Sequence, residues 1–503
     1  MPPIAYDWTK LVNPNYTFLL PELIVVAFML LIMVADFYVK EKRWLVGFAF
    51  FGVLLAVLAD WFAATSEAIK GAIDTGAPLE FFGNMVIADG FTFFLKAVLM
   101  VAVALVILLS YDYVEKFLKG MYVEFYEVLL AAMLGMMFMV SSRDLITIYI
   151  GLELTSISSY ILAGLLRKDP KSNEAALKYF LNGAVASAVL LFGLSLIYGV
   201  SGTTYLPEVA RQLTMRVAES KEFIPMIVAG VLFMAGGFSF KIAAVPMHLW
   251  APDAYEGAPT PVTAFFSVGP KGAAFGAILR IFLVGMGAAE FSGRWMAIWA
   301  VLAAASMFVG NLTALMQTNI KRMMAYSSIA QAGYILVGVV AAGKTGFGTS
   351  AVLFYVLAYA LTNLGIFAVL TQMDREGGWV SVSDFKGLAT RNPWYAWALL
   401  VFFISLIGIP PTAGFMGKFF LFRAAVASNY LWLALCMAVN SVISVGYYYG
   451  VVKAMFLENA DREALPIRFG TMATVVVCFV GVILVGILAN GFVGLTTAAA
   501  LVK

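Results

Sequence analysis

The chain has 503 residues, of which 62% are hydrophobic and only 12% are charged, whereas soluble globular domains carry about twice that charged fraction. This composition excludes an ordinary soluble protein, and the thinly spread net charge of +3 excludes a nucleic-acid partner. Two cysteines and one histidine provide no ligand set for a metal centre or a disulfide framework, so we expect no metal and no cofactor in this chain.

Long apolar segments recur along the whole chain. A bilayer core about 30 Å thick needs about 20 apolar residues per helix. The first segment is too long for the core of a signal peptide and lacks a basic stretch before it, so we expect a retained membrane helix. The segments predict an all-α polytopic membrane protein with about fourteen transmembrane helices, near 17–38, 44–64, 89–110, 123–141, 144–166, 174–199, 224–249, 261–285, 293–314, 321–343, 347–373, 394–425, 430–456 and 470–497.

Lysine and arginine concentrate in the connections after the first, third, fifth, ninth, eleventh and thirteenth predicted helices. Positively charged residues favour the cytoplasmic side of a membrane. We therefore expect both chain termini on the outer side, with the odd-numbered helices running inward.

Charged side chains interrupt several of the apolar segments. Glu153 lies close to the middle of its segment, and Lys241, Lys271 and Lys418 stand in three others. Ionisable residues at this depth are costly, face the bundle interior and mark ion pathways, while buried ion pairs are the structural alternative. Three further cations lie off-centre or near helix ends, where snorkelling to the membrane surface explains them: Lys96, Arg280 and Arg423.

Glycine and proline interrupt the seventh and twelfth predicted helices. The run GGFSFKIAAVP carries Lys241, and the run SLIGIPPTAGFMGKFF carries Lys418. Unwound backbone is tolerated in a membrane where it lines a cavity, and paired broken helices in two halves of a chain point to a transport site. If helices 4–8 and 9–13 each form a five-helix unit, their odd number inverts the second unit relative to the first.

His248 is the only histidine and follows Lys241 by about two helical turns. A histidine titrates near neutrality and could relay protons from Lys241 toward Lys271. Because Pro246 interrupts the helical register, a purely structural role for His248 stays equally open.

Four runs carry a family resemblance: FKIAAVPMHLWAPDAYEGAPTPVTAFFS, GLELTSISSYIL, NIKRMMAYSSIAQAGYIL and IGIPPTAGFMGKFFLF. They are similar to the antiporter-like membrane subunits of respiratory complex I and of the Mrp-type cation/proton antiporters, over predicted helices 4–13. The chain resembles the N-type members most, because M-type members carry glutamate where this chain has Lys418. The run FLLPELIVVAFMLLIMVAD near the N-terminus also looks N-like.

The resemblance implies two inverted five-helix repeats with broken helices 7 and 12. The implied layout is an N-terminal three-helix segment at 1–122, repeats at 123–285 and 286–456, and a C-terminal helix at 457–503. It also implies a mid-membrane proton-transfer axis, whose residues map here onto Glu153, Lys241, Lys271 and Lys418.

The resemblance further implies a multi-pass protein of a bacterial-type cell (inner) membrane, in contact with lipid and with other membrane subunits. These would form a proton-translocating NADH-quinone oxidoreductase. NADH or a related donor, flavin, Fe–S clusters and quinone are then expected in the wider complex. One lysine whose pKa is modulated provides enough free energy to gate a proton. A change of about 3 in the pKa of a lysine corresponds to about 4 kcal/mol, which is comparable with moving one charge across about 175 mV.

Two other functions fit the same residues. The chain could be a subunit of an Mrp-type Na⁺(K⁺)/H⁺ antiporter, driven by ion gradients rather than by electrons. It could also be a scaffold whose buried charges only hold helices together. A lysine row favours protons over a bare metal cation, because such cations prefer oxygen ligands.

Overall fold

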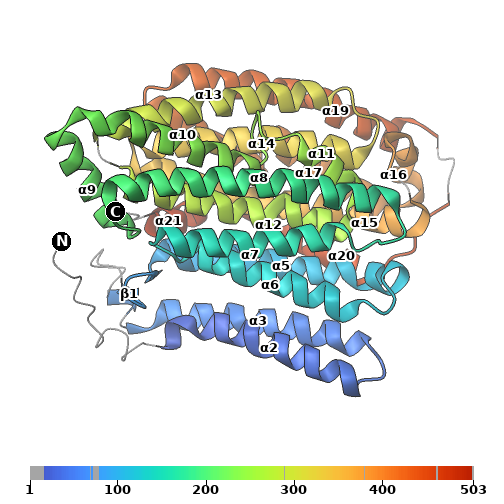
Figure 1. Cartoon of the computed structure of the whole chain (residues 1–503). Helices are drawn as coiled ribbons and strands as arrows, with labels where there is room; N and C mark the ends of the chain where they lie inside the picture. Colours follow the sequence, from blue (N-terminus) through green and yellow to red (C-terminus); the bar gives the residue numbers. More distant parts are fainter. Residues whose placement is uncertain are drawn as a thin grey trace.

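The part of the chain that the structure describes is almost entirely helical. This computed structural model describes residues 16–67, 69–71, 79–287, 289–378, 380–459 and 463–500. Within these residues, thirteen helices are long and apolar enough to cross a membrane, and most of their axes run in roughly the same direction (Figure 1). The prediction of an all-α polytopic membrane protein is confirmed. The count of about fourteen spans and the two inverted repeats stay predictions.

The N-terminal helices lie along one side of the bundle, at the bottom of Figure 1. A 3-10 turn (Tyr16–Leu19) leads into α2 (Leu20–Tyr38), and α3 (Arg43–Thr65) packs against α2. The next membrane helix, α5 (Gly90–Phe117), packs against α3 in turn.

A short hairpin precedes α5, in a place where the apolar pattern predicted no strand. Its strands β1 (Leu79–Phe81) and β2 (Val86–Ala88) pair antiparallel. The hairpin is fixed to the end of α6, because the Ile87 amide donates a hydrogen bond of 2.8 Å to the Ser141 carbonyl. We call the end of the bundle that carries these strands the hairpin end.

Two of the helices in the middle of the chain, α7 and α8, begin after an aspartate that caps them. Asp144, for example, accepts hydrogen bonds from the amides of Ile146 and Thr147 at 3.0 and 2.9 Å and so starts α7. The helices of this part of the chain are α6 (Tyr122–Val140), α7 (Leu145–Ala163), α8 (Pro170–Ser201), α9 (Leu206–Glu219), α10 (Ile224–Lys241), α11 (Trp250–Gly257) and α12 (Thr260–Leu279), which continues as a π turn over Arg280–Gly285. α9 fell outside every predicted apolar segment because it is amphipathic, with buried Leu206, Val209, Leu213 and Val217 on one face.

The remaining helices follow with short connections, apart from the segment before α20 and the segment before α16, which contains a 3-10 turn (Val382–Phe385). They are α13 (Ala289–Ala314), α14 (Ile320–Ala342), α15 (Gly346–Gly377), α16 (Leu388–Arg391), α17 (Pro393–Ile407), α18 (Ala413–Ala427), α19 (Leu431–Leu457), α20 (Phe469–Ile487) and α21 (Ala489–Ala499). The sequence predicted a single last helix over 470–497, whereas in the structure this helix is interrupted at Leu488 and forms α20 and α21. Asn490 and Gly491 are poor helix formers and follow this break directly.

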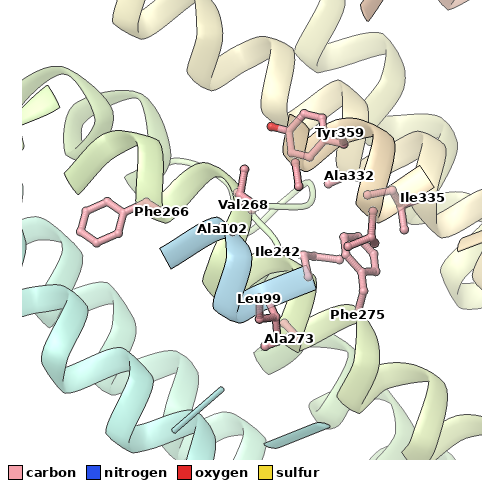
Figure 2. Packing of buried hydrophobic residues seen from close by; sticks show 14 of the residues in the cluster. Leu99, Ala102, Ile242, Phe266, Val268, Ala273, Phe275, Ala332, Ile335 and Tyr359 are labelled. Carbon is pink, nitrogen blue, oxygen red and sulfur yellow. The ribbon is translucent and has the colours of Figure 1, made fainter. Parts of the chain in front are cut away.

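The centre of the bundle is formed by α12, α14 and α15, whose side chains are nearly all buried. Figure 2 shows part of this core, with Leu99 of α5, Phe275 of α12, Ile335 of α14 and Tyr359 of α15 among its members. The outer helices α2, α8 and α19 instead leave many large apolar side chains exposed. This apolar exterior suits contact with lipid or with neighbouring membrane subunits.

The seventh predicted span is broken, as the sequence indicated. α10 ends at Lys241 and α11 begins at Trp250. Side chains satisfy the backbone freed by the break: Ser306 accepts a hydrogen bond from the Val245 amide at 2.9 Å, and the Trp250 indole donates to the Phe240 carbonyl at 2.9 Å. Non-helical backbone is therefore stabilised by protein at this depth.

The twelfth predicted span is broken as well. α17 ends at Ile407, followed by Gly408 with a φ of 91°, and α18 begins at Ala413. Two features require glycine at position 408. Its backbone is left-handed, and a Cβ added there would lie only 3.0 Å from Cδ of Lys418. The Ser405 hydroxyl accepts a hydrogen bond from the Gly414 amide at 3.1 Å and bridges the break.

Snorkelling is the wrong explanation for two of the three off-centre cations. Lys96 and Arg280 are fully buried, and each pairs with a carboxylate. Their position near the end of an apolar segment suggested access to the membrane surface, but neighbouring helices cover both side chains. Arg423 is exposed and lies 4.7 Å from the Phe347 ring centroid, as snorkelling along an apolar surface requires.

Replacing Arg280 by methionine is expected to destabilise the protein by about 3–5 kcal/mol, because it leaves Asp89 buried and unpaired. Arg280 forms a two-pronged pair with Asp89 at 2.6 and 2.7 Å. The thermal midpoint of the protein in detergent measures the loss. Arg423→Met, at an exposed cation, serves as the control, and equal midpoints for the two variants would contradict the assignment.

Candidate functional site

Lys241 is the last residue of α10 and lies in a pocket of hydroxyl groups. Its ammonium donates hydrogen bonds to Ser156 Oγ at 2.7 Å, to Ser187 Oγ at 3.3 Å and to the Tyr160 hydroxyl at 3.4 Å. The side chain is 7% exposed. A buried ammonium needs such partners, since its desolvation is otherwise uncompensated.

Glu153 of α7 is the carboxylate nearest to this ammonium. Its Oε1 lies 3.9 Å from Lys241 Nζ, and Ser187 of α8 connects the two by donating a 2.5 Å hydrogen bond to the same oxygen. Glu153 is 24% exposed, at the edge of the bundle. The two predicted partners are therefore brought together, linked by one hydroxyl that is able both to accept and to donate a proton.

Charged pairs anchor the short helix α11, which follows the break after Lys241. Asp253 accepts hydrogen bonds of 2.7 Å from both Lys178 of α8 and Arg322 of α14. Glu256 accepts from Lys171 and Arg322 at 2.8 and 2.9 Å. This network ties the segment after the break to two neighbouring helices, one before it and one after it in the sequence.

Lys271 lies in α12 and is 4% exposed. Its ammonium donates a hydrogen bond to the Ser328 hydroxyl of α14 and lies 5.5 Å from the Tyr255 ring centroid. Ser328 also meets the hydroxyls of Tyr255 and Tyr359 at 3.2 and 3.0 Å. Within the described residues, no ion pair involves Lys271, so a hydroxyl group and an aromatic ring stabilise this cation without a carboxylate.

Lys418 of α18 uses the break in its own span. Its ammonium donates to the Ile407 carbonyl at 3.0 Å, a group that the end of α17 leaves free, and to Ser441 Oγ at 3.1 Å. The Tyr334 ring centroid lies 4.4 Å away. Over the described part of the chain, Lys418 also has no recorded carboxylate partner.

Polar side chains of α13, α14 and α19 lie beside Lys418. Asn311 donates to the Tyr334 hydroxyl at 3.2 Å and to Asn440 Oδ1 at 3.1 Å, and it accepts from the Tyr447 hydroxyl at 3.0 Å. On α14, Ser327 meets the Tyr448 hydroxyl at 2.5 Å, and one turn later Gln331 accepts a hydrogen bond from the Tyr355 hydroxyl. Hydroxyl and amide groups therefore extend along α14 between the neighbourhoods of Lys271 and Lys418.

Comparison of this chain with known protein families supports the fold and the resemblance described above. The family model described as NADH:quinone oxidoreductase/Mrp antiporter, TM matches residues 142–444. The chain belongs to this family. The match runs from α7 into the middle of α19, and it includes Glu153, Lys241, Lys271 and Lys418.

Relatives within the family cover nearly the whole chain. NADH-quinone oxidoreductase subunit N 2 of Symbiobacterium thermophilum is 65% identical over 99% of both chains. NADH-quinone oxidoreductase subunit N of Trichlorobacter lovleyi is 42% identical over 89% of both. The predicted resemblance to the N-type members of the antiporter-like family is confirmed.

Solved structures of the family share the fold. A chain of respiratory complex I from Thermus thermophilus matches with a TM-score of 0.77 and 30% identity, over 94% of this chain and 99% of its own. A chain of the Mrp complex from Dietzia sp. DQ12-45-1b matches with a TM-score of 0.82 over 97% of both chains. Its 21% identity shows the fold alone.

Sequence reasoning missed the hydroxyl groups that hold the lysines of this family member. Ser156 and Tyr160 had a signal, because they follow Glu153 by three and seven residues on one helix face. Ser187 had none, since it stands among small residues of α8 and its role arises from packing. Ser328 also had none, because it reaches Lys271 from another helix.

His248 stands apart from the lysines. Among the described residues, no hydrogen bond or ion pair joins its side chain to Lys241 or Lys271, and its buried Nδ1 has no recorded partner. It lies in the non-helical segment between α10 and α11, between exposed Met247 and Leu249. A relay through His248 stays a prediction.

Proposed function

We propose that this chain is the proton-translocating membrane subunit of a respiratory NADH-quinone oxidoreductase. In this proposal, protons move along the row Glu153, Lys241, Lys271 and Lys418, and the movement is coupled to quinone reduction in other subunits. The observation that best supports this proposal is the environment of the buried Lys241. Its ammonium lies 3.9 Å from the Glu153 carboxylate, and both groups form a hydrogen bond with Ser187. The names of its relatives, which are subunits N of NADH-quinone oxidoreductases, support the assignment of the complex.

The chemistry begins with the interaction of Glu153 and Lys241. An ionised carboxylate at this distance favours the ammonium form of the lysine, and neutralising or withdrawing that carboxylate favours proton release. Ser187 provides a proton path between the two, because its hydroxyl accepts from the ammonium and donates to the carboxylate. Lys241 is therefore the modulated group of the row.

Lys271 and Lys418 serve in this proposal as the central relay and the distal terminus. Neither has a carboxylate partner among the described residues, so a second charge arriving nearby changes its proton affinity strongly. Hydroxyl groups at Ser328 and Tyr359 lie next to Lys271, and Ser441 lies next to Lys418. Protons then pass between the lysines through these groups and water.

The wider complex would supply the redox chemistry. Flavin, Fe–S clusters, quinone and NADH or a related donor belong to partner subunits in this proposal, and the partners adjoin the apolar exterior of the bundle. The distribution of Lys and Arg supports a cell (inner) membrane topology with both termini outside. The layout of 1–122, 123–285, 286–456 and 457–503 is proposed with it.

A sodium requirement separates this proposal from an Mrp-type antiporter subunit. The proposed row offers ammonium groups where a bare cation needs oxygen ligands, so donor-driven proton uptake should persist at the same rate when choline replaces Na⁺. The measurement is dye-reported proton uptake by sealed vesicles that contain the assembled complex, a donor and quinone. Proton movement driven by a Na⁺ gradient alone, without the donor, would contradict the proposal.

A further inference from the structure

A second group of buried charged side chains lies in the N-terminal helices. Glu22 of α2, Asp60 of α3 and Lys96 of α5 are at most 3% exposed. Glu22 Oε1 lies 2.5 Å from Lys96 Nζ. Glu22 Oε2 and Asp60 Oδ1 have no hydrogen-bond partner within the described residues. These three residues, which we call the N-terminal triad, have no contact with Glu153, Lys241, Lys271 or Lys418 in the described interactions.

Aromatic side chains close this triad at the hairpin end. The Phe18 ring centroid lies 4.4 Å from Lys96 Nζ. Phe18 in turn stacks on Phe81 of β1 at 5.0 Å and packs edge-on against Phe93 at 5.9 Å. The ammonium therefore faces a cluster of apolar rings, and all three buried residues lie in surroundings where an unbalanced charge is costly.

Among the residues that the structure describes, no other charged side chain pairs with the triad. Asp60 lies within electrostatic range of Lys96 and Glu22, and its helix α3 packs against both α2 and α5, which carry these two residues. At the hairpin end, Asp89 is tied to Arg280, and Glu80 is tied to Arg143 and Tyr205. The other charged residues on the helices that pack around Asp60 lie toward the opposite ends of those helices: Asp36, Arg43, Asp112, Glu115, Lys116, Glu124 and Glu127.

Two ionised carboxylates and one ammonium would leave a net negative charge in this closed space. One bound proton removes that charge and gives one carboxylic acid, one carboxylate and one ammonium. A metal cation is the poorer occupant, because such cations take several oxygen ligands and the ammonium already occupies one carboxylate oxygen.

We propose that Glu22, Asp60 and Lys96 form a second proton-binding site, separate from the row of Glu153 and the three lysines. The two carboxyl groups share one exchangeable proton, and the Lys96 ammonium pairs with whichever carboxylate is charged. When the proton leaves the hydroxyl of one carboxylic acid and bonds to an oxygen of the other, Lys96 changes partner and keeps its own three protons. The site binds one proton at the hairpin end of the N-terminal helices.

Substitutions distinguish a shared proton from a fixed ion pair. Glu22→Gln and Asp60→Asn should each assemble into the complex at parental levels, because the remaining carboxylate pairs with Lys96. The double variant should lower the amount of assembled complex by at least about tenfold, since Lys96 is then unpaired. Adding Lys96→Met to the double variant should restore assembly. Loss of the complex in Glu22→Gln alone, with Asp60→Asn unaffected, would overturn the proposal.

Infrared spectroscopy of the purified complex detects the proton itself. At neutral pH, the parent should show a protonated-carboxyl C=O band that shifts in D₂O and is absent from both Glu22→Gln and Asp60→Asn. Glu67→Gln, at an exposed carboxylate near the same end, should keep the band. A band unchanged in both triad variants would overturn the proposal, as would a sodium-dependent rise in thermal stability that Asp60→Asn abolishes.

Discussion

Replacing Lys241 by methionine is expected to lower donor-driven proton uptake by at least about tenfold while the complex still assembles, a lower bound because a positioned proton-transfer group contributes about 10²–10⁴-fold. Methionine keeps the apolar stem of the side chain but removes the ammonium that contacts Ser156 and Ser187. The nearby carboxylate of Glu153 then has no cation whose proton it controls. Proton uptake by sealed vesicles, normalised to the amount of assembled complex, measures the loss.

The control for Lys241→Met is Lys344→Met. Lys344 is exposed, and its ammonium lies 4.8 Å from the Tyr430 ring centroid. The substitution therefore removes a lysine that lies outside the proposed row. Its proton uptake should match the parent. Parental proton uptake by an assembled Lys241→Met complex would mean that Lys241 is a structural residue.

The second large effect is expected at Lys271 and at the hydroxyl group that holds it. Lys271→Met should reduce proton uptake by at least about tenfold, for the same reason as at Lys241. Ser328→Ala should cause a smaller loss, because Lys271 remains while its link to Tyr255 and Tyr359 is removed. Dye-reported uptake in vesicles gives both values.

Ser195→Ala is a matched control for the serine substitution. Ser195 is exposed on α8, and its hydroxyl donates only to the Phe192 carbonyl of its own helix. Its proton uptake should equal that of the parent. If Ser328→Ala behaves like Ser195→Ala and Lys271→Met keeps parental uptake, Lys271 has no part in proton movement.

The sequence was sufficient to predict the membrane helices and the two breaks, because both depend on local properties. Apolar length sets a span, and the glycine and proline residues around Lys241 and Lys418 set where helices end. The four candidate residues Glu153, Lys241, Lys271 and Lys418 could also be selected, since a charge within an apolar segment is visible without knowledge of its neighbours.

The partners of these charges could not be predicted, because they come from other helices. Ser187 on α8 and Ser328 on α14 reach their lysines only through packing. The same limit explains Lys96 and Arg280, whose partners Glu22 and Asp89 lie far away in the sequence. Depth within an apolar segment says nothing about which side chains a neighbouring helix provides.

The central claim is that the Lys241 ammonium controls proton movement coupled to quinone reduction. The most direct measurement records proton uptake and quinone reduction together, in sealed vesicles that contain equal amounts of the parent or the Lys241→Met complex. The account predicts that both activities fall in the variant while assembly persists. Two unchanged activities at equal assembly would contradict the claim and leave Lys241 as a structural residue.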